Sequence, residues 1–495
     1  MKPILLCSIN AKWIHPSLAL RLLKANLCEL ENRAEILEFN PRQSLDEKTA
    51  AVLAAGPRVL ALSVSIWNHA ETLRLLAALE EAWRERPVIV LGGPEVSWLD
   101  AGAELFRYAD HVIRGEGETA FRDLCRAALD GGSIPRFIDA PPSDTSLLLP
   151  AYRLYSDEDL ARKLTYVEAS RGCPFGCEFC QSSIGLGVSA APGVREFPLE
   201  NFLGEMDRLI KRGARTFKFL DRSFNVNTER AICIAEFFLE RLQKSPGGNP
   251  PFTVHFEMIP SRFPPELRKT LARFPPGSLR LEIGIQTLNR TTAAAVKRPG
   301  DPEEELQTLR LLRKETSAII HADLIAGLPG EDLPGFGRGF DRLWEALSAE
   351  APPSPPAVEE GGGTESPPAP RNIQAEIQLG ILKLLPGTAM IRHSERSGMR
   401  YAPDPPYEVR ETAALPAQDL DRVKNFARFW ERIVNRRAFS SILPALLPFG
   451  KPVFERFIKL ADDLLARFGK NWGIDKQQLK EALERRLLTQ EKERP

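Results

Sequence analysis

The sequence predicts an α/β protein with two parallel sheets and a helical region after them. Short apolar runs alternate with amphipathic helical patterns along two separate stretches, as they do in parallel α/β folds. From about residue 415 onward, apolar residues recur at helical spacing. The length of 495 residues favours two or three domains of about 150 residues each. We therefore expect a five-stranded sheet, a partial six-unit barrel and a helical C-terminal region.

Five apolar runs predict the strands of the first sheet, at residues 3–8, 34–39, 58–65, 87–92 and 111–114. Several of these runs end in small or acidic residues, at the strand ends where doubly wound sheets bind ligands. The candidate ligand-binding residues are Ser63, Ser65, Gly92, Gly93, Gly115, Glu116 and Gly117. Glycines at these ends would let a ligand approach the backbone, although tight turns alone explain them equally well. This first domain is expected to cover residues 1–135, with a linker over residues 136–160.

Six further runs predict a second parallel series, at residues 164–169, 216–220, 252–256, 279–285, 319–325 and 373–379. Six strand–helix units make an open, partial barrel over residues 161–400, two units short of a closed eightfold barrel. Residues 351–371 are rich in Pro, Gly and Glu and have no apolar period, which predicts a disordered insert.

The last segment, residues 401–495, is predicted to be a helical C-terminal domain. One helical face carries Val423, Phe426, Trp430 and Ile433, and a second carries Leu479, Leu483 and Leu487. We expect these faces to pack on the barrel, and a partner-binding helix is the alternative.

Charge and hydropathy exclude several classes of partner. Lys and Arg together number 66, as do Asp and Glu, so the net charge is zero and nucleic acid is not an expected partner. No apolar run reaches the roughly 18 residues that a membrane helix needs, which predicts a cytoplasmic protein without a membrane partner. Seven cysteines are too few for a disulfide scaffold. We expect the four scattered ones to be small buried side chains; they are Cys7, Cys28, Cys125 and Cys233.

The other three cysteines, Cys173, Cys177 and Cys180, directly follow the first predicted barrel strand. Barrel enzymes place their catalytic residues at such strand ends. Structural zinc and a ferredoxin cluster each take four protein ligands, whereas a [4Fe–4S] cluster with three cysteines leaves one iron open for chemistry. A zinc site completed by a distant histidine and three inert thiols are the alternatives.

The spacing Cys-x3-Cys-x2-Cys, with Phe179 before the last cysteine, resembles the radical S-adenosylmethionine (SAM) superfamily. The resemblance implies that the three cysteines hold a [4Fe–4S] cluster and that SAM chelates its open iron. Reduction would then cleave SAM to a 5′-deoxyadenosyl radical. The resemblance also implies an electron donor such as flavodoxin or ferredoxin.

Other barrel positions match the family more loosely. Asp221, Glu257, Gly284 and Gln286 fall at strands where the family contacts SAM, and Glu257 would accept hydrogen bonds from the ribose hydroxyls. For each of these residues a purely structural role is the alternative, and for Asp221 that role would be capping of the following helix.

The first domain, taken with the cysteine motif, resembles the subgroup of radical SAM proteins that have a Rossmann-like cobalamin-binding domain. The seven strand-end residues named above would then cradle cobalamin. The Asp-x-His-x-x-Gly pattern that supplies a cobalt ligand in many such domains is absent, because residues 8–15 are SINAKWIH. The axial ligand is therefore open, and a packing or capping role for His15 is favoured over cobalt binding.

Three functions remain from the sequence. The leading one is a cobalamin-dependent methyltransferase that acts on an unactivated carbon of a small-molecule or peptide substrate, with SAM as radical source and methyl donor. The second is a radical SAM enzyme that binds cobalamin for ring contraction or cyclisation. The third is a non-catalytic cobalamin or iron–sulfur sensor. A methylthiotransferase is disfavoured, because Cys7, Cys28 and Cys125 are poorly placed to hold a second cluster.

Overall fold

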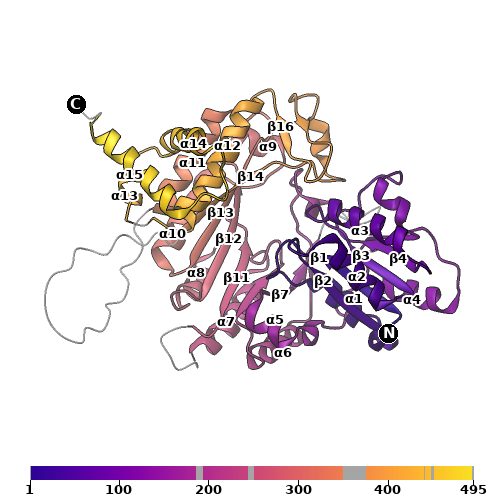
Figure 1. Ribbon diagram of the computed structural model, residues 1–495. Helices are drawn as coiled ribbons and strands as arrows, with labels where there is room; N and C mark the ends of the chain where they lie inside the picture. The colour runs from indigo at the N-terminus through magenta and orange to yellow at the C-terminus, as the bar shows by residue number, and fades with distance from the viewer. Residues whose placement is uncertain are drawn as a thin grey trace.

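The computed structural model describes residues 2–184, 193–243, 250–348, 375–439, 441–447 and 451–492. Two parallel sheets stand next to one another, and the helical C-terminal region covers the end of the second sheet that is remote from the first (Figure 1). The predicted insert at residues 351–371 lies outside the described residues.

The N-terminal sheet has six parallel strands in the order β2-β1-β3-β4-β5-β6. They are β1 (Ile4–Ile9), β2 (Ala34–Phe39), β3 (Val59–Ser63), β4 (Val88–Gly92), β5 (His111–Gly115) and β6 (Phe137–Ala140). The sequence predicted only five, because β6 has four residues and forms by pairing with β5. The sheet therefore extends past residue 135, into the stretch expected to be a linker.

Helices cover both faces of this sheet, which explains the continuous apolar runs. Every residue of β1 is buried, with Ile4 and Leu6 on one face and Leu5 and Cys7 on the other. The four helices are α1 (Leu18–Ala25), α2 (Leu45–Ala55), α3 (His69–Ala82) and α4 (Glu118–Asp130). Helices α1 and α4 pack on the face of Ile4, and α2 and α3 pack on the face of Leu5. The 3-10 helices Cys28–Arg33 and Glu104–Tyr108 complete the domain.

The second sheet is the predicted partial barrel of six parallel strands, in the order β14-β13-β12-β11-β10-β7. Its strands are β7 (Thr165–Val167), β10 (Thr216–Phe219), β11 (Thr253–Met258), β12 (Leu279–Gln286), β13 (Ile319–Ala326) and β14 (Ala375–Ile381). Its helices are α6 (Leu199–Lys211), α7 (Thr228–Gln243), α8 (Pro265–Ala272), α9 (Arg290–Ala295), α10 (Pro302–Glu315) and α11 (Leu333–Ser348). The 3-10 helix Tyr152–Leu154 and α5 (Asp157–Arg162) connect the two sheets.

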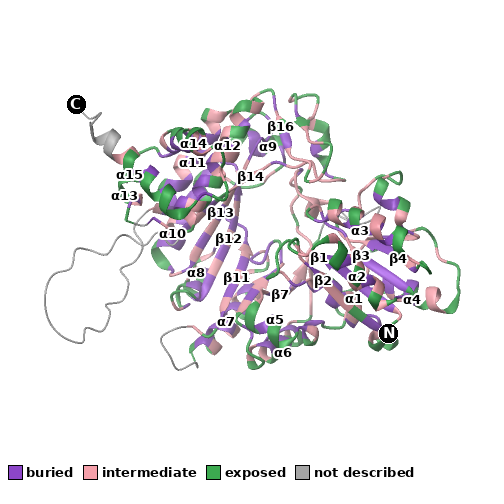
Figure 2. Cartoon of the chain, in the orientation of Figure 1, coloured by how far each residue is buried: buried purple, intermediate pink, exposed green. Residues whose placement is uncertain are grey.

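Buried and partly exposed residues alternate along strands β11 to β13 (Figure 2). The buried residues pack on helices, and the opposite face carries charged side chains. On the charged face, the Oε2 atom of Glu282 lies 3.1 Å from Lys218 Nζ and 3.1 Å from His255 Nε2. His321 Nε2 lies 2.7 Å from Asp323 Oδ1. These pairs neutralise charges that would otherwise be partly buried alone.

The C-terminal region packs on the barrel as predicted. Its elements are the 3-10 helix Ala389–His393, β15 (Arg400–Tyr401), β16 (Val409–Glu411), α12 (Ala417–Trp430), the π-helical turn Glu431–Asn435, α13 (Leu443–Leu446), α14 (Phe454–Phe468) and α15 (Lys476–Lys492). Phe340 of α11 meets the rings of Phe426 and Trp430 at centroid distances of 5.0 and 4.8 Å. Val423 and Ile433 are fully buried on the same face. Barrel and C-terminal helices therefore share one hydrophobic core.

The scattered cysteines divide into two kinds. Cys7 and Cys125 are buried, as predicted, but Cys28 and Cys233 are exposed, and the prediction was wrong for them. Cys28 opens a 3-10 helix with a positive φ of 53°, and Cys233 lies off the buried stripe of α7. Among the described residues, no helix is both long enough and apolar enough to span a membrane.

Candidate functional site

The three motif cysteines lie on a loop that begins just after β7. The chain first forms β8 (Ser170–Arg171), which pairs antiparallel with β9 (Arg195–Glu196). Gly172 then turns the backbone with φ of +92°, and a Cβ at this residue would lie 2.3 Å from the Gly193 carbonyl oxygen. Only glycine fits this turn, so it sets where the cysteine loop starts.

Backbone hydrogen bonds hold the cysteine loop in shape. The amide of Cys180 donates to the Cys177 carbonyl at 3.1 Å, and the amide of Glu178 donates to the Val296 carbonyl at 3.0 Å. All three cysteines are free and partly buried. Burial raises the pKa of the Cys177 thiol to about 11, and it also raises the pKa of Cys173. Metal binding to these thiols would therefore displace protons.

Asp221 holds the start of this loop instead of capping a helix. Its side chain is buried and accepts hydrogen bonds from the Ala169 amide at 3.0 Å and from Ser170 Oγ at 2.6 Å. The next helix, α7, begins seven residues later at Thr228, so the capping alternative was wrong. Burial raises the pKa of Asp221 to about 6. Both carboxylate oxygens face the loop.

The predicted SAM-contacting residues of β12 form an irregular strand end. The register with β13 shifts between Gly284 and Gln286, and Gln286 has a positive φ of 66°, which is rare outside glycine. A Cβ at Gly284 would lie 2.3 Å from Gln286 Nε2. The glycine thus leaves room for the glutamine side chain, and such strain is typical of functional sites.

Glu257 lies on β11, on the charged face of the barrel. Its Oε2 atom is 3.6 Å from Arg222 Nη1, and burial raises its pKa to about 7, opposed by Arg222. A carboxylate in this state accepts or donates a hydrogen bond at neutral pH.

A cavity of about 770 Å³ lies between the N-terminal sheet and the cysteine loop. Pockets for small ligands and cofactors have this size. Six of the seven strand-end residues predicted in the first domain line it, namely Ser63, Gly92, Gly93, Gly115, Glu116 and Gly117. From the second sheet it is lined by Arg171, Gly172 and Gln181, which flank the cysteines, and by Leu220 and Arg222.

Two glycines of this cavity, Gly93 and Gly115, have no room for side chains. Gly93 and Gly115 have positive φ values of 109° and 91°. A Cβ at Gly93 would lie 2.4 Å from the Val64 carbonyl oxygen, and one at Gly115 would lie 2.3 Å from the Ala140 carbonyl oxygen. The strand ends are therefore bare backbone that a ligand can approach closely.

Two candidate residues of the first domain, Ser65 and His15, are not among the residues that line the cavity. The Ser65 amide donates to Asn68 Oδ1 at 2.8 Å. His15 packs across to the barrel, where its Nδ1 atom is 2.6 Å from the Tyr166 hydroxyl. This packing role is the one that the sequence favoured over cobalt binding.

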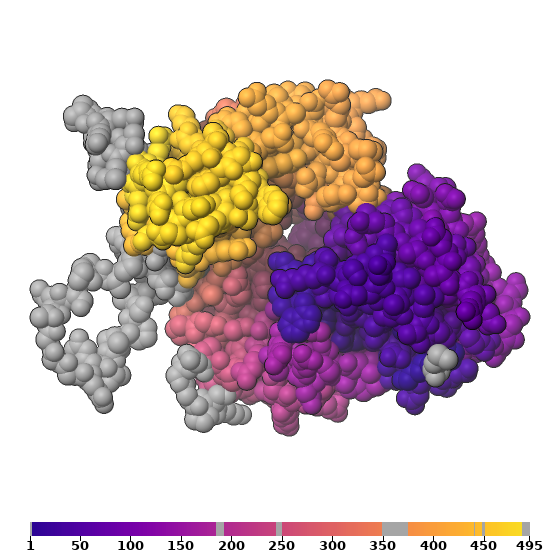
Figure 3. All heavy atoms as spheres, viewed as in Figure 1, coloured from indigo at the N-terminus to yellow at the C-terminus, as the bar shows by residue number. Residues whose placement is uncertain are grey.

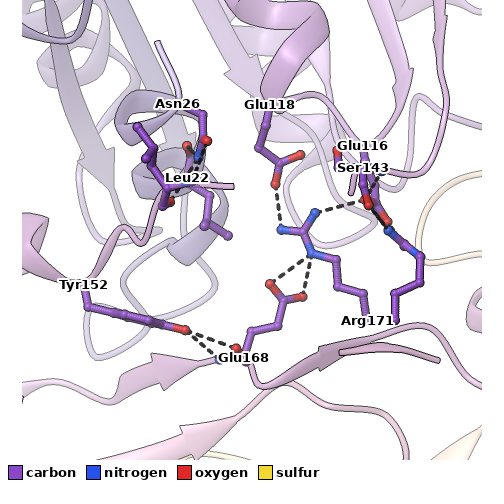
Figure 4. Close-up of polar contacts among 10 residues, drawn as sticks. Leu22, Asn26, Glu116, Glu118, Ser143, Tyr152, Glu168 and Arg171 are labelled. Carbon is purple, nitrogen blue, oxygen red and sulfur yellow. Dashed lines mark hydrogen bonds and ion pairs between the residues drawn. The ribbon is translucent and has the colours of Figure 1, made fainter. Parts of the chain in front are cut away.

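An ion-pair network joins the two sheets at the cavity wall (Figure 4). Arg171, two residues before Cys173, lies 3.1 Å from Glu116 and 2.6 Å from Glu118 of the first domain, and 3.1 Å from Glu168 of its own loop. Arg195 bonds to Glu116 as well, and its Nη1 atom donates to the Ser143 carbonyl at 2.6 Å. The cysteine loop is thus tied directly to the glycine-rich strand end.

Two carboxyl groups that bind Arg171, those of Glu168 and Glu116, have pKa values shifted in opposite directions. Burial raises the pKa of Glu168 to about 7, an effect that Arg171 opposes. For Glu116, burial acts in the same direction, but Arg195 and Arg171 outweigh it and lower the pKa. Glu116 is therefore ionised at neutral pH, whereas Glu168 titrates near it.

Sequence reasoning missed Arg171, Glu118 and Arg195 as site residues. Their partners are more than fifty positions away, and one sequence gives no sign of that pairing. A local signal existed for Arg171, because it lies just after a predicted barrel strand and a buried arginine needs an anionic partner.

The donor sets fit an iron–sulfur cluster and a large cofactor. Three free thiols share one loop, and the bare strand ends face a cavity of cofactor size. Among the described residues, no three His, Cys, Asp or Glu side chains gather to hold a single metal ion. A cluster does not need that arrangement, because each thiolate binds a different iron.

Family comparisons define the class of the protein. A model of the radical SAM superfamily matches residues 167–336, and a model of the B12 binding domain matches residues 5–125. The chain therefore carries a B12-binding domain followed by a radical SAM domain. A radical SAM domain uses a [4Fe–4S] cluster and SAM, and a B12-binding domain takes cobalamin.

Two relatives show which proteins are similar in sequence. The cobalamin-dependent radical SAM methyltransferase TokK of Streptomyces tokunonensis is 25% identical over 393 residues, which cover 73% of this chain and 54% of TokK. The 2-(S-pantetheinyl)-carbapenam-3-carboxylate methyltransferase of Streptantibioticus cattleyicolor is 25% identical over 331 residues, covering 60% of this chain and 47% of that protein. The chain spans about half the length of these curated relatives.

Solved structures share the fold. The cobalamin-dependent SAM radical enzyme OxsB, with aqua-cobalamin bound, has a TM-score of 0.64 at 14% identity and covers 99% of this chain and 80% of its own. The radical SAM methyltransferase TsrM from Kitasatospora setae, with cobalamin and a [4Fe–4S] cluster bound, has a TM-score of 0.58 at 16% identity over 82% of this chain and 78% of its own.

Proposed function

We propose that the protein is a cobalamin-dependent radical SAM methyltransferase that methylates an unactivated carbon. The observation that carries the proposal is the shared cavity, which the strand ends of the B12-binding domain and the flanks of the cysteine loop line together. A radical source and a methyl donor must reach the same substrate atom, and one cavity between the two sites meets that requirement. The similarity to two methyltransferases supports the same reaction.

In this proposal, Cys173, Cys177 and Cys180 hold the cluster. Glu257, Gly284 and Gln286 contact SAM, and the strand ends at Ser63, Gly92, Gly93, Gly115 and Gly117 cradle cobalamin. The bound groups supply a radical that abstracts a hydrogen atom and a methyl group that replaces it.

The protein's own residues position these sites. Asp221 fixes the strand that leads into the cysteine loop, through its bonds to Ala169 and Ser170. Arg171 and Arg195 hold that strand against Glu116, so the cavity wall cannot open without breaking partly buried ion pairs. Removing one partner of such a pair leaves a buried charge uncompensated.

A small molecule is the substrate class that we favour over a peptide. The support is the name of the second relative, which states a carbapenam carboxylate substrate for that protein. The reductant is a one-electron carrier such as flavodoxin or ferredoxin.

The test uses anaerobically reconstituted protein with iron, sulfide, hydroxocobalamin, a reductant and SAM that carries a deuterated methyl group. Methylation predicts both 5′-deoxyadenosine and S-adenosylhomocysteine, and a product from a metabolite extract that gains a labelled methyl. Formation of 5′-deoxyadenosine without S-adenosylhomocysteine or labelled product would instead identify a non-methylating enzyme. Cobalamin binding without SAM cleavage would identify a sensor.

A further inference from the structure

A loop of the C-terminal region reaches from the end of β14 to both cofactor sites. We call residues 384–407 the bridging loop. Its two ends are bonded to each other at its base, where the Leu384 amide donates to the Tyr407 carbonyl at 3.0 Å and the Val409 amide donates to the Leu382 carbonyl at 2.8 Å. The Leu382 amide in turn donates to Ala326 of β13 at 2.9 Å, so the loop stands on the barrel itself.

One side of the bridging loop is hydrogen-bonded to the cysteine loop. Glu178 lies between Cys177 and Cys180, and its side chain is only 2% exposed. Arg392 Nε donates to Glu178 Oε2 at 2.7 Å, and His393 Nε2 is bonded to the same oxygen at 2.7 Å. A third bond joins the loops, from Gln181 Nε2 to the Pro386 carbonyl at 3.0 Å. A buried carboxylate with two bonded nitrogens is a strong anchor.

The other side of the bridging loop contacts the B12-binding domain through a hydrogen bond and a packing contact. The Tyr407 hydroxyl donates to Glu95 Oε1 at 2.6 Å, and His69 Nδ1 is 2.9 Å from the same oxygen. Glu95 lies two residues after Gly93 of the strand end, and its side chain is 1% exposed. Gly387 packs on the ring of Trp98, where a Cβ would come within 2.7 Å of the ring. Trp98 itself lines the cavity.

The contact between these distant parts of the chain is visible in the space-filling view. In Figure 3 the orange atoms of the C-terminal region rest on the purple atoms of the N-terminal domain. The bridging loop thus touches the residues beside Cys177 and Cys180 on one side and the residues beside Gly93 on the other.

We propose that Tyr407 and Arg392 are positioning residues that couple the two cofactor sites, so that assembly of the cluster orders the cobalamin-binding strand end through the bridging loop. Coupling requires a physical connection that both sites bias. The two buried carboxylates, Glu178 and Glu95, provide it, because each is bonded to the same closed loop from an opposite side. The inference rests on the two cofactor sites and not on methyl transfer.

The test measures hydrogen exchange at residues 93–98 in protein without a cluster and in protein reconstituted anaerobically with iron and sulfide. In the wild type, cluster assembly should slow exchange there by about fivefold or more, the lower end of ordinary coupling. Tyr407→Phe should reduce this protection below about twofold while retaining the same iron content. A purely structural role for Tyr407 would change exchange equally in both forms of the protein.

The matched control is Tyr401→Phe, because Tyr401 lies in the same loop and, among the described residues, its hydroxyl bonds only to Met399 Sδ of that loop. It should keep the wild-type protection. Gly387→Ala is a second disrupting variant, since it adds a Cβ against Trp98 at a φ of +79°. The inference is overturned if the wild type shows no protection, if Tyr407→Phe keeps it, or if Tyr401→Phe loses it equally.

A second readout is the affinity for hydroxocobalamin, measured by equilibrium dialysis with and without the cluster. The cluster should tighten binding about fivefold in the wild type and in Tyr401→Phe, and less than about twofold in Tyr407→Phe and Gly387→Ala. Equal cluster dependence in all four proteins would contradict the coupling. Neither readout requires turnover, so failure of methyl transfer would leave both results standing.

Discussion

The two sheets of this protein build ligand sites at the same place by opposite means. Both are parallel and six-stranded, and both present their carboxyl ends to the shared cavity. The N-terminal sheet ends in glycines such as Gly93 and Gly115, where any side chain would strike the backbone. The barrel ends in thiols and charged groups. The first site should therefore be sensitive to added atoms, and the second to removed ones.

The largest expected effect is in the barrel, where Cys177→Ala deletes one thiol. We expect the reconstituted iron content to fall from about four per chain to below about one, because a cluster with two protein ligands is unstable. Iron and sulfide assays with electron paramagnetic resonance measure this. Cys233→Ala, at an exposed cysteine outside the motif, is the control and should keep the wild-type content. A full cluster in Cys177→Ala would remove this residue from the ligand set.

The next effect tests the N-terminal sheet by adding one methyl group. Gly93→Ala places a Cβ 2.4 Å from the Val64 carbonyl oxygen at a φ of +109°, which forces the strand end to move. Cobalamin affinity should fall at least about tenfold, with a loss of about 1–3 kcal/mol in the free energy of unfolding. Dialysis against hydroxocobalamin and urea unfolding measure the two. Gly102→Ala, where a Cβ meets nothing within 4 Å, should change neither.

One glycine of the barrel tests whether only the N-terminal sheet is sensitive to added atoms. Gly284→Ala would bring a Cβ to 2.3 Å from Gln286 Nε2 and displace that side chain. SAM should bind about tenfold more weakly while the iron content stays normal. Isothermal titration with SAM measures the change, and Gly204→Ala on α6 is the control with open space. Unchanged SAM affinity would show that Gly284 shapes only the strand.

A smaller expected effect is on the pH dependence of stability, which should differ between two of the carboxyl groups that bind Arg171. The folded protein raises the pKa of Glu168 from 4.5 to about 7, so it binds a proton more tightly than the unfolded chain. Stability from this group is thus present at low pH and is lost as the pH rises from about 4.5 to about 7. Glu168→Gln should flatten that decline by about 1–3 kcal/mol. Urea midpoints at pH 5 and pH 8 test it, and an equally steep decline in the variant would contradict it.

Glu116 should behave in the opposite sense, because its pKa is lowered in the folded protein. Its contribution is present at neutral pH and is lost only as the pH falls through that lowered pKa. Glu116→Gln should therefore lower stability at pH 8 and leave the slope between pH 5 and pH 8 unchanged.

The smallest effect concerns the cysteines outside the motif. In cluster-free protein, iodoacetamide should modify Cys28 and Cys233 and spare Cys7 and Cys125, because burial raises the pKa of Cys7 to about 12 and blocks access. Mass spectrometry of the alkylated peptides measures this without changing activity. Rapid labelling of Cys7 in native protein would show that the first sheet opens easily.

Local pattern predicted most of the fold because both sheets consist of consecutive strand–helix units. It failed at β6, where four residues gain their strand character only from β5. At the candidate site, the glycines picked out by chain position line the cavity, and their contact with a ligand stays a prediction. Chain position did not indicate that Asp221 accepts hydrogen bonds from the Ala169 amide and the Ser170 hydroxyl, or that Ser65 is not among the residues that line the cavity.

Contacts between distant segments were outside the reach of the sequence. The pairing of Arg171 with Glu116 and that of Tyr407 with Glu95 join residues 55 and 312 positions apart. A single sequence shows periodicity and local turn signals, but it does not show which residues of one domain will contact which residues of another. The aromatic packing of Phe426 and Trp430 was predictable as a buried face, whereas its partner Phe340 was not.

The position of the bridging loop along the chain orders events during synthesis. Every strand of the N-terminal sheet lies before residue 141, so this domain can be complete while the barrel is still being made. Tyr407 leaves the ribosome roughly 270 residues later, which at about 5–20 residues per second is on the order of 10 to 60 seconds. For that interval the bridging loop does not yet cover the strand end at Gly93. A large cofactor can then reach this strand end in the nascent protein without passing the loop.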